Sequence, residues 1–260
     1  MATARVVLIA GLLLTYALAA AAQEGGCVSC HETHFTREGR CASCHRGDPQ
    51  AVRETLAHHG LLRGPAAAWR MPGSPILTRG RAMRDSLGCR RCHTTGGRGE
   101  RLAIDLDTAV WERSQTQLRD ALQKPAASMP DFALTTAQCD TLAALLLHDG
   151  DPHPAQETYQ VRFQHTASDT VPVFTRLCGD CHRALGRGGP MGSGRDGPDL
   201  SGLTGEFYPV PIDARWDAER LEKWLANPRS LRPATTMPPV RVNRGELQAI
   251  LRELSGLPAR

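Results

Sequence analysis

The stretch "CVSCHETHFTREGRCASCH", residues 27–45, holds four cysteines and three histidines within nineteen residues. It repeats one pattern twice: two cysteines separated by two residues, with a histidine directly after the second cysteine. The pattern recurs as "CRRCH" at 89–93 and as "CGDCH" at 178–182. Eight of the nine cysteines therefore belong to four copies, and only Cys139 lies outside them. Any chemistry assigned to the copies has to use both cysteines and the histidine.

Zinc and dithiol redox chemistry explain this pattern poorly. A zinc ribbon pairs two Cys-x-x-Cys knuckles about 15–20 residues apart, whereas the first two copies lie closer together and the last two lie far apart. Zinc also gives no reason for a histidine after every second cysteine. A thioredoxin-like dithiol needs one pair beside a strand and a helix, not four copies. Zinc sites and disulfides are therefore the weaker alternatives.

Covalent haem c accounts for every repeated position. Each cysteine adds to a vinyl group of the porphyrin and forms a thioether, and the adjacent histidine ligates the iron from one side. Two intervening residues let both sulfurs reach the ring from one helical turn. We therefore expect four haem c groups. The expected attachment residues are Cys27, Cys30, Cys41, Cys44, Cys89, Cys92, Cys178 and Cys181, and the expected proximal ligands are His31, His45, His93 and His182.

The composition fits a chain that builds its cores around large apolar groups. Aromatic residues make up only 5% of the 260 residues, and 25 glycines and 18 prolines predict long loops. Small domains with thin cores usually need a metal, a disulfide or a cofactor. The formal net charge of +4 is spread along the chain without a basic run. We therefore expect redox partner proteins and no nucleic-acid partner.

The N-terminal stretch "MATARVVLIAGLLLTYALAAAAQ" is typical of an export signal. One arginine precedes an apolar run, and Ala20 and Ala22 form an A-x-A cleavage site before Gln23. We predict that residues 1–22 are a signal peptide, with a retained membrane anchor as the alternative. Because haem c is attached outside the cytoplasm, both predictions agree on a periplasmic protein in an oxidising compartment.

The rest of the chain predicts a mostly α fold in three parts. A loop-rich dihaem segment occupies residues 24–70, and two monohaem helical domains follow at 75–150 and 156–260. Residues 63–75, "RGPAAAWRMPGSP", are rich in Pro, Gly and Ala and predict a linker. No segment shows the alternation of a β-strand.

Within the two helical domains, cap residues predict where helices begin and end. We expect a helix directly before the third motif, one over 107–123 with Asp107 or Thr108 as its cap, and one that begins after Thr135 or Thr136 and ends at Gly150. The last domain predicts a helix before the fourth motif, one over 215–228, and a final helix capped by Asn243. Cys139 is expected to be a buried unpaired thiol, with an intermolecular disulfide as the alternative.

The last two segments resemble class I cytochrome c domains, which run helix, Cys-x-x-Cys-His, loop, helix, Met-Pro loop, helix. In the final segment, "GPDL" at 197–200 resembles the family motif whose proline, here Pro198, packs against the proximal histidine, and "LEKWLANP" followed by "TTMPP" resembles the path to the distal methionine. The middle segment has "SMPDF" but no Gly-Pro-x-Leu. The first segment, with "CHETHF", resembles multihaem cytochromes of respiratory chains, in which two histidines ligate each iron.

These resemblances imply the distal ligands. Met129 and Met237 each precede a proline in a loop between two helices, which is the family position of the distal methionine. For the first two haems the candidates are His34, His58 and His59. Met71 and Met191 are weaker candidates because Met71 belongs to the predicted linker and Met191 to the loop after the fourth motif.

The implied ligand sets predict an electron relay. Methionine raises a haem potential and two histidines leave it lower. Six-coordinate irons have no open position for substrate. We expect a periplasmic tetrahaem c-type cytochrome that relays electrons in a respiratory chain, with a membrane b-type cytochrome or quinol-oxidising complex as one partner. The alternative is a multihaem oxidoreductase with one five-coordinate haem that reduces peroxide or an oxyanion.

Overall fold

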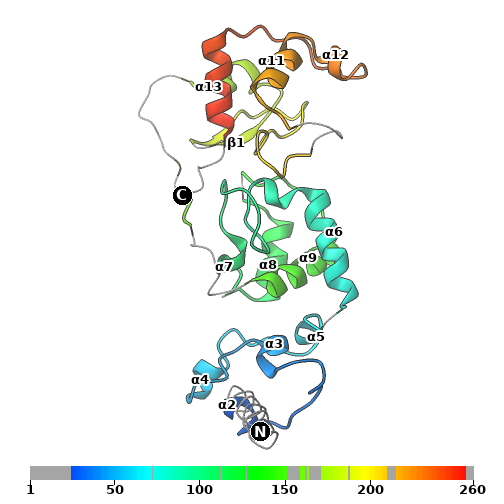
Figure 1. Ribbon diagram of the computed structural model, residues 1–260, viewed down its shortest axis with the longest axis vertical. Helices are drawn as coiled ribbons and strands as arrows, with labels where there is room; N and C mark the ends of the chain where they lie inside the picture. The colour runs from blue at the N-terminus through cyan, green and yellow to red at the C-terminus, as the bar shows by residue number, and fades with distance from the viewer. Residues whose placement is uncertain are drawn as a thin grey trace, which may run out of the picture. The chain divides into compact units, whose positions relative to one another are not determined.

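The computed structural model describes residues 25–71, 73–111, 113–126, 128–150, 159–161, 163, 171–186, 188–209 and 215–255. The chain divides into two compact units, residues 1–79 and 80–260. Helices dominate and strand is scarce, which confirms the mostly helical character expected from the sequence (Figure 1). The predicted signal peptide or anchor lies outside the described residues. Within them, no helix is long and apolar enough to cross a membrane.

The first unit consists of short helices joined by loops. The elements are α2 (Gly25–Val28), α3 (Cys41–His45), α4 (Glu54–Ala57) and α5 (Pro65–Ala68). Helix α3 consists of the second cysteine motif itself. Helix α5, of four residues, lies inside the predicted linker. Its sequence suits a helix, because Pro65 occupies the first helical position and three alanines follow.

The first unit buries few of its own side chains. Between residues 25 and 71, the buried side chains that the structure describes are Arg46, Leu62 and Ala67. Several large apolar side chains in the same segment are exposed instead: Val28, Phe35, Val52 and Leu56. A segment of this size with so thin a core needs another apolar group to fold stably.

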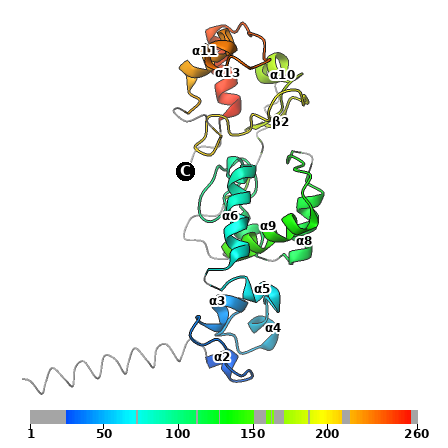
Figure 2. The same cartoon turned by 90° about the vertical axis from the view of Figure 1, so that its right-hand side faces the viewer.

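The second unit begins within α6 (Pro75–Leu87), which spans the unit boundary, and continues through η1 (Cys89–Arg91), α7 (Leu106–Ala109), α8 (Gln115–Gln123) and α9 (Thr136–Asp149). Helices α8 and α9 lie side by side (Figures 1 and 2). The predicted bounds of α9 are confirmed, because Thr135 caps its first turn and Gly150 follows its last residue. Cys139 is buried on this helix as a free thiol, as predicted.

The single helix predicted over 107–123 is wrong, because the chain forms two helices there. Asp105, two residues before the predicted cap, accepts the first-turn hydrogen bond of α7. A new helix then begins after Ser114, which forms a capping box with Gln117. Such a reciprocal pair satisfies two backbone donors and marks an N-terminus strongly.

The second unit ends with α10 (Val173–Cys178), strands β1 (Ala184–Gly186) and β2 (Gly189–Met191), and helices α11 (Ala218–Ala226), α12 (Pro228–Leu231) and α13 (Arg244–Leu254). The two strands pair antiparallel, with Ala184 opposite Met191. The sequence predicted no strand, and three-residue strands containing glycine and proline carry too little β-propensity to be recognised.

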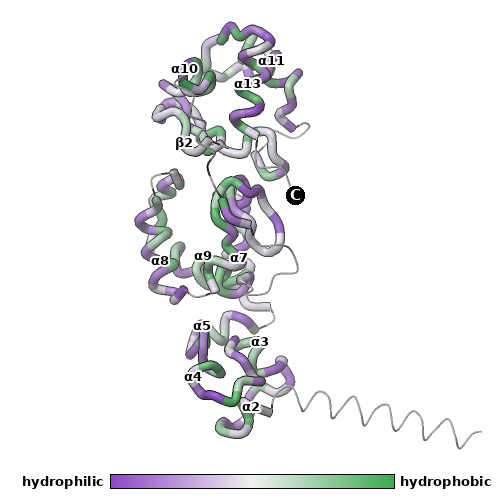
Figure 3. The backbone as a smooth tube through the Cα atoms, turned by 90° about the vertical axis from the view of Figure 1, so that its left-hand side faces the viewer, coloured by the Kyte–Doolittle hydropathy of each residue, from purple (hydrophilic) through white to green (hydrophobic). Residues whose placement is uncertain are grey.

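A continuous core joins the helices of this last part. Phe174 on α10, Leu221 on α11 and Ile250 on α13 are buried in one cluster. Helix α13 alternates between hydrophobic and hydrophilic residues along its length (Figure 3), as a helix with one buried face should. The predicted N-cap is confirmed, because the Asn243 side chain accepts a hydrogen bond from the Glu246 amide.

Replacing this cap should destabilise the last part of the chain. We expect Asn243→Ala to lower the free energy of unfolding by about 1 kcal/mol, because one amide of the first turn loses its acceptor. Asn243→Ser keeps a capping oxygen and should stay close to the parent protein. Denaturant titrations of both variants measure the difference, and equal stability of the alanine variant would show that the cap contributes nothing.

Candidate haem-binding sites

Three of the four motif histidines each make the same kind of hydrogen bond. In each, ring nitrogen Nδ1 lies within hydrogen-bonding distance of a backbone carbonyl further along the chain. Because a carbonyl only accepts, Nδ1 carries the proton and Nε2 keeps its lone pair for a metal ion. Metal-binding histidines are usually oriented in this way. The three pairs are His45 with Leu62 (3.0 Å), His93 with Ile104 (2.7 Å) and His182 with Pro198 (2.8 Å).

The loop that carries Pro198 packs closely on the His182 ring. A Cβ atom placed on Gly197 would collide with three atoms of that imidazole. The glycine of the "GPDL" stretch therefore allows the close approach, and the proline supplies the carbonyl. His182 is buried, so its ring has little freedom to turn away from this acceptor. These residues fit a proximal haem ligand held in one orientation.

The middle segment reaches the same geometry without the Gly-Pro-x-Leu stretch. The Ile104 carbonyl takes the place that Pro198 has beside His182. The loop between His93 and Ile104 is held by the buried carboxylate of Asp107, which accepts hydrogen bonds from the amides of Gly96 (2.7 Å) and Gly97 (2.8 Å). Burial lowers the pKa of His93 and so favours the neutral imidazole, the form that can ligate iron.

Burial disfavours the thiolate form of three of the four cysteines in the last two motifs. Burial is the main cause that raises the pKa of Cys89, Cys92 and Cys178 to about 11. A reactive dithiol or a zinc site needs thiolates, which electropositive surroundings normally favour. The described residues also contain no group of three or more His, Cys, Asp or Glu side chains placed to hold a metal ion. The described residues are thus not grouped as a zinc ribbon requires.

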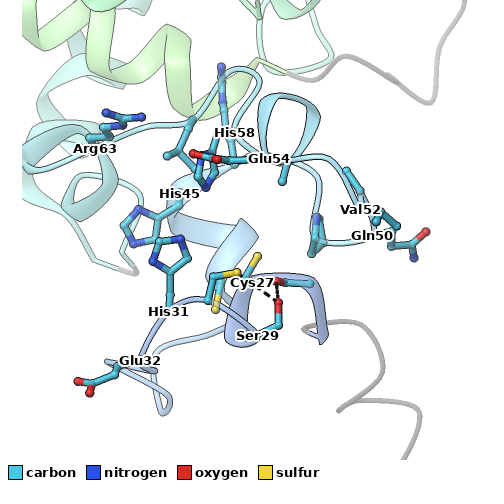
Figure 4. A pocket seen from close by; sticks show the side chains of 18 of the residues that line it. Cys27, Ser29, His31, Glu32, His45, Gln50, Val52, Glu54, His58 and Arg63 are labelled. Carbon is cyan, nitrogen blue, oxygen red and sulfur yellow. Dashed lines mark hydrogen bonds and ion pairs between the residues drawn. The ribbon is translucent and has the colours of Figure 1, made fainter.

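In the first unit, the two adjacent motifs open onto one cavity of about 1180 Å³. Figure 4 shows His31, His45, His58 and Cys27 around it. The volume exceeds the roughly 300–1,000 Å³ of common small-ligand pockets. A cavity of this size that both motifs share, in a segment with a thin core, fits two large apolar groups close together.

The cavity brings its histidines together in two pairs. His34 and His45 face each other with Nε2 atoms 3.2 Å apart and rings only 8° from parallel. The rings of His31 and His58 have centroids 5.8 Å apart. Two imidazoles on opposite sides of one metal ion hold their nitrogens about 4 Å apart, given bonds of about 2 Å each. The nitrogens of His34 and His45 are therefore near the spacing of two ligands of one metal ion, and the rings of His31 and His58 lie close to each other.

The structure separates the two neighbouring candidates of this unit. His58 lines the cavity and has the Glu54 carboxylate 3.7 Å from its Nδ1, the kind of partner that orients a ligating ring. His59 does not line the cavity and is exposed. Sequence alone could not choose between two adjacent histidines, because only the local backbone decides which one points inward.

The two candidate methionines each lie in a segment between two helices. Met237 lies between α12 and α13, half-buried against the core, and the Trp224 indole N–H donates to its sulfur at 3.0 Å. Met129 lies between α8 and α9 and is half-buried. Met191 is buried in β2 as part of the core cluster, which favours a packing role over ligation.

One comparison with known proteins agrees with this geometry. Residues 171–252 match the family model for cytochrome c, and that range contains the fourth motif, Pro198 and Met237. The chain therefore carries a cytochrome c domain there, which supports a c-type cytochrome that binds haem covalently and transfers electrons. A search of curated proteins and a search of solved structures each gave no significant match.

The close approach of Gly197 gives a direct test of the fourth site. We expect Gly197→Ala to displace the loop from His182. If His182 and Met237 hold one haem iron, as the resemblance implies, the change should also disturb the methionine ligand. The methionine–iron charge-transfer absorption in the near infrared should fall or disappear. Gly245→Ala is the matched control, because this glycine lies in α13 and a Cβ there would meet only the Asn243 side chain. An unchanged band in Gly197→Ala would remove the assigned role of that loop.

The histidine pairs in the first unit give a second test. We expect His34→Ala to leave one haem without its distal ligand, so that it becomes high-spin and binds CO after reduction. His59→Ala, a change in an exposed histidine outside the cavity, should leave all spin states as in the parent protein. Electron paramagnetic resonance and CO difference spectra measure both variants. The reverse result would assign the distal role to His59.

Proposed function

We propose that this chain is a periplasmic tetrahaem c-type cytochrome that relays electrons in a respiratory chain. The observation that carries the proposal is the four-fold Cys-x-x-Cys-His motif, with Nδ1 of His45, His93 and His182 each placed beside a backbone carbonyl. The cytochrome c match at 171–252 supports it for the last domain. Export through the predicted signal peptide at 1–22 would bring the chain to the compartment where haem c is attached.

The proposed ligands divide the chain into a low-potential and a high-potential part. Haem c supplies one-electron chemistry when it is bound. His34 and His58 would complete two bis-histidine sites in the first unit, and such sites keep low potentials. Met129 and Met237 would raise the potentials of the two sites in the second unit. Electrons would then run from the first unit towards the second.

The proposed direction indicates which partners each end meets. A membrane quinol-oxidising complex that contains a b-type cytochrome would deliver electrons to the first unit, which follows the predicted signal or anchor. A downstream acceptor protein would take them from the second unit. The modest net charge of +4 suits electrostatic attraction to an acidic redox partner.

The relay is tested by a spectroelectrochemical titration of the purified protein, with the spin state recorded at each plateau. Intact mass should first show four covalent haems. We expect all four to be low-spin, to titrate in two separated groups of two, and to bind little CO when reduced. A high-spin haem that binds CO would favour the alternative, an oxidoreductase with one five-coordinate catalytic haem. Fewer than four haems would contradict the tetrahaem assignment.

A further inference from the structure

Arg91, the residue before the second cysteine of the third motif, reaches a loop more than a hundred residues away. Its Nη2 donates hydrogen bonds to the carbonyls of Asp199 (2.6 Å) and Ser201 (2.9 Å), and its Nε donates to Ser201 as well (3.1 Å). The side chain is mostly buried. A charged donor that meets two carbonyls with fork geometry makes strong and directional bonds.

The loop that Arg91 holds is the loop that orients His182. Pro198, whose carbonyl lies 2.8 Å from His182 Nδ1, directly precedes Asp199. The Asp199 carboxylate lies between two cations, Arg91 at 3.5 Å and Arg183 at 3.2 Å, and Arg183 directly follows His182. A continuous series of covalent and hydrogen bonds therefore runs from the third motif to the proximal ligand of the fourth.

Several further contacts fix Arg91 in this position. Its guanidinium lies over the Tyr208 ring at 4.5 Å from the centroid, within the range of a cation–π interaction. The backbone carbonyl of Arg91 packs so closely on Gly202 that a side chain there would collide with it. Gly202 has a φ of +67°, which glycine adopts without strain.

Neighbouring residues extend the same contact. The Glu100 carboxylate accepts a hydrogen bond from the Glu206 amide at 3.0 Å. The Arg98 guanidinium pairs with the Glu206 carboxylate at 2.7 Å and lies over the Phe207 ring. The loop after the third motif and the loop after the fourth are thus held together by charged, backbone and aromatic contacts.

We propose that Arg91 is a positioning residue that couples the third and fourth haem sites. It holds the attachment motif of one site against the loop that orients the proximal histidine of the other, so the two sites keep a fixed relation. Its positive charge close to both sites favours the reduced, less positive state of each. This inference rests on the proposed function only in requiring haem at residues 89–93 and 178–182.

The test compares Arg91→Gln with a matched variant, Arg176→Gln. Arg176 lies two residues before Cys178 and is half-exposed. It forms an ion pair with Glu246 of α13 and has no bond to the 199–201 loop among the described contacts. Each change removes one positive charge near a motif, but only the first removes the bonds to the 199–201 loop. Both are made in the full-length holoprotein, and haem content is measured by intact mass.

For Arg91→Gln we expect the potentials of two of the four haems to shift downward, because a buried cation is lost and Asp199 keeps its negative charge. We also expect calorimetric unfolding of the second unit to separate from one transition into two. Arg176→Gln should leave both properties as in the parent, because exposed ion pairs contribute little. Unchanged potentials in Arg91→Gln would overturn the proposal, even if stability fell.

A second variant covers the case in which Arg91→Gln does not incorporate haem. Tyr208→Leu removes the ring beneath the guanidinium but leaves the charge and the motif intact. We expect a smaller downward shift of the same two potentials, and no shift would overturn the proposal. If the parent protein carried fewer than four haems, the tetrahaem assignment would be wrong. The present inference would still be tested by the two sites of the second unit alone.

Discussion

The hydrogen bond from a motif imidazole to a backbone carbonyl is the constraint on which the described sites depend. A Cys-x-x-Cys-His motif fixes the sulfurs and the ring close together in sequence, but it does not fix the rotation of the ring. A carbonyl brought from a distant part of the chain does so, and it selects the nitrogen that remains free for a metal ion. The loops ending at Leu62, Ile104 and Pro198 therefore have to fold back onto their histidines, and this requirement shapes each site.

The two units meet this constraint with different amounts of protein core. In the second unit, leucines of α9 and the cluster around Ile250 hold the helices in place before any cofactor is considered. The first unit has almost no such core and exposes apolar residues such as Phe35 and Val52. Its conformation would therefore depend more strongly on any group attached to its cysteines. Because of this difference, we expect the first unit to be less stable than the second.

Sequence reasoning recovered the features that carry a local signal. Thr135 and Asn243 cap helices because a side-chain oxygen there meets an exposed amide. Asn243 was identified from position and residue type, and Thr135 was one of two neighbouring threonines proposed. It failed where the decisive group has no signature. Every residue has a backbone carbonyl, so the residue type at position 104 does not mark Ile104 as the partner of His93. The same holds for Arg91, whose partners lie more than a hundred residues away and can be found only after the chain has folded.

The repeated proximal geometry also limits where differences between the sites can arise. If three histidines of one chain have the same tautomer and the same kind of carbonyl partner, the proximal side contributes little to any difference in their potentials. What then distinguishes the sites is the opposite ligand, burial and nearby charge. A histidine faces His45 across the cavity of the first unit, whereas the loop beyond α12 offers the sulfur of Met237. In the proposed relay, any difference in potential between the sites would therefore be determined by residues outside the motifs.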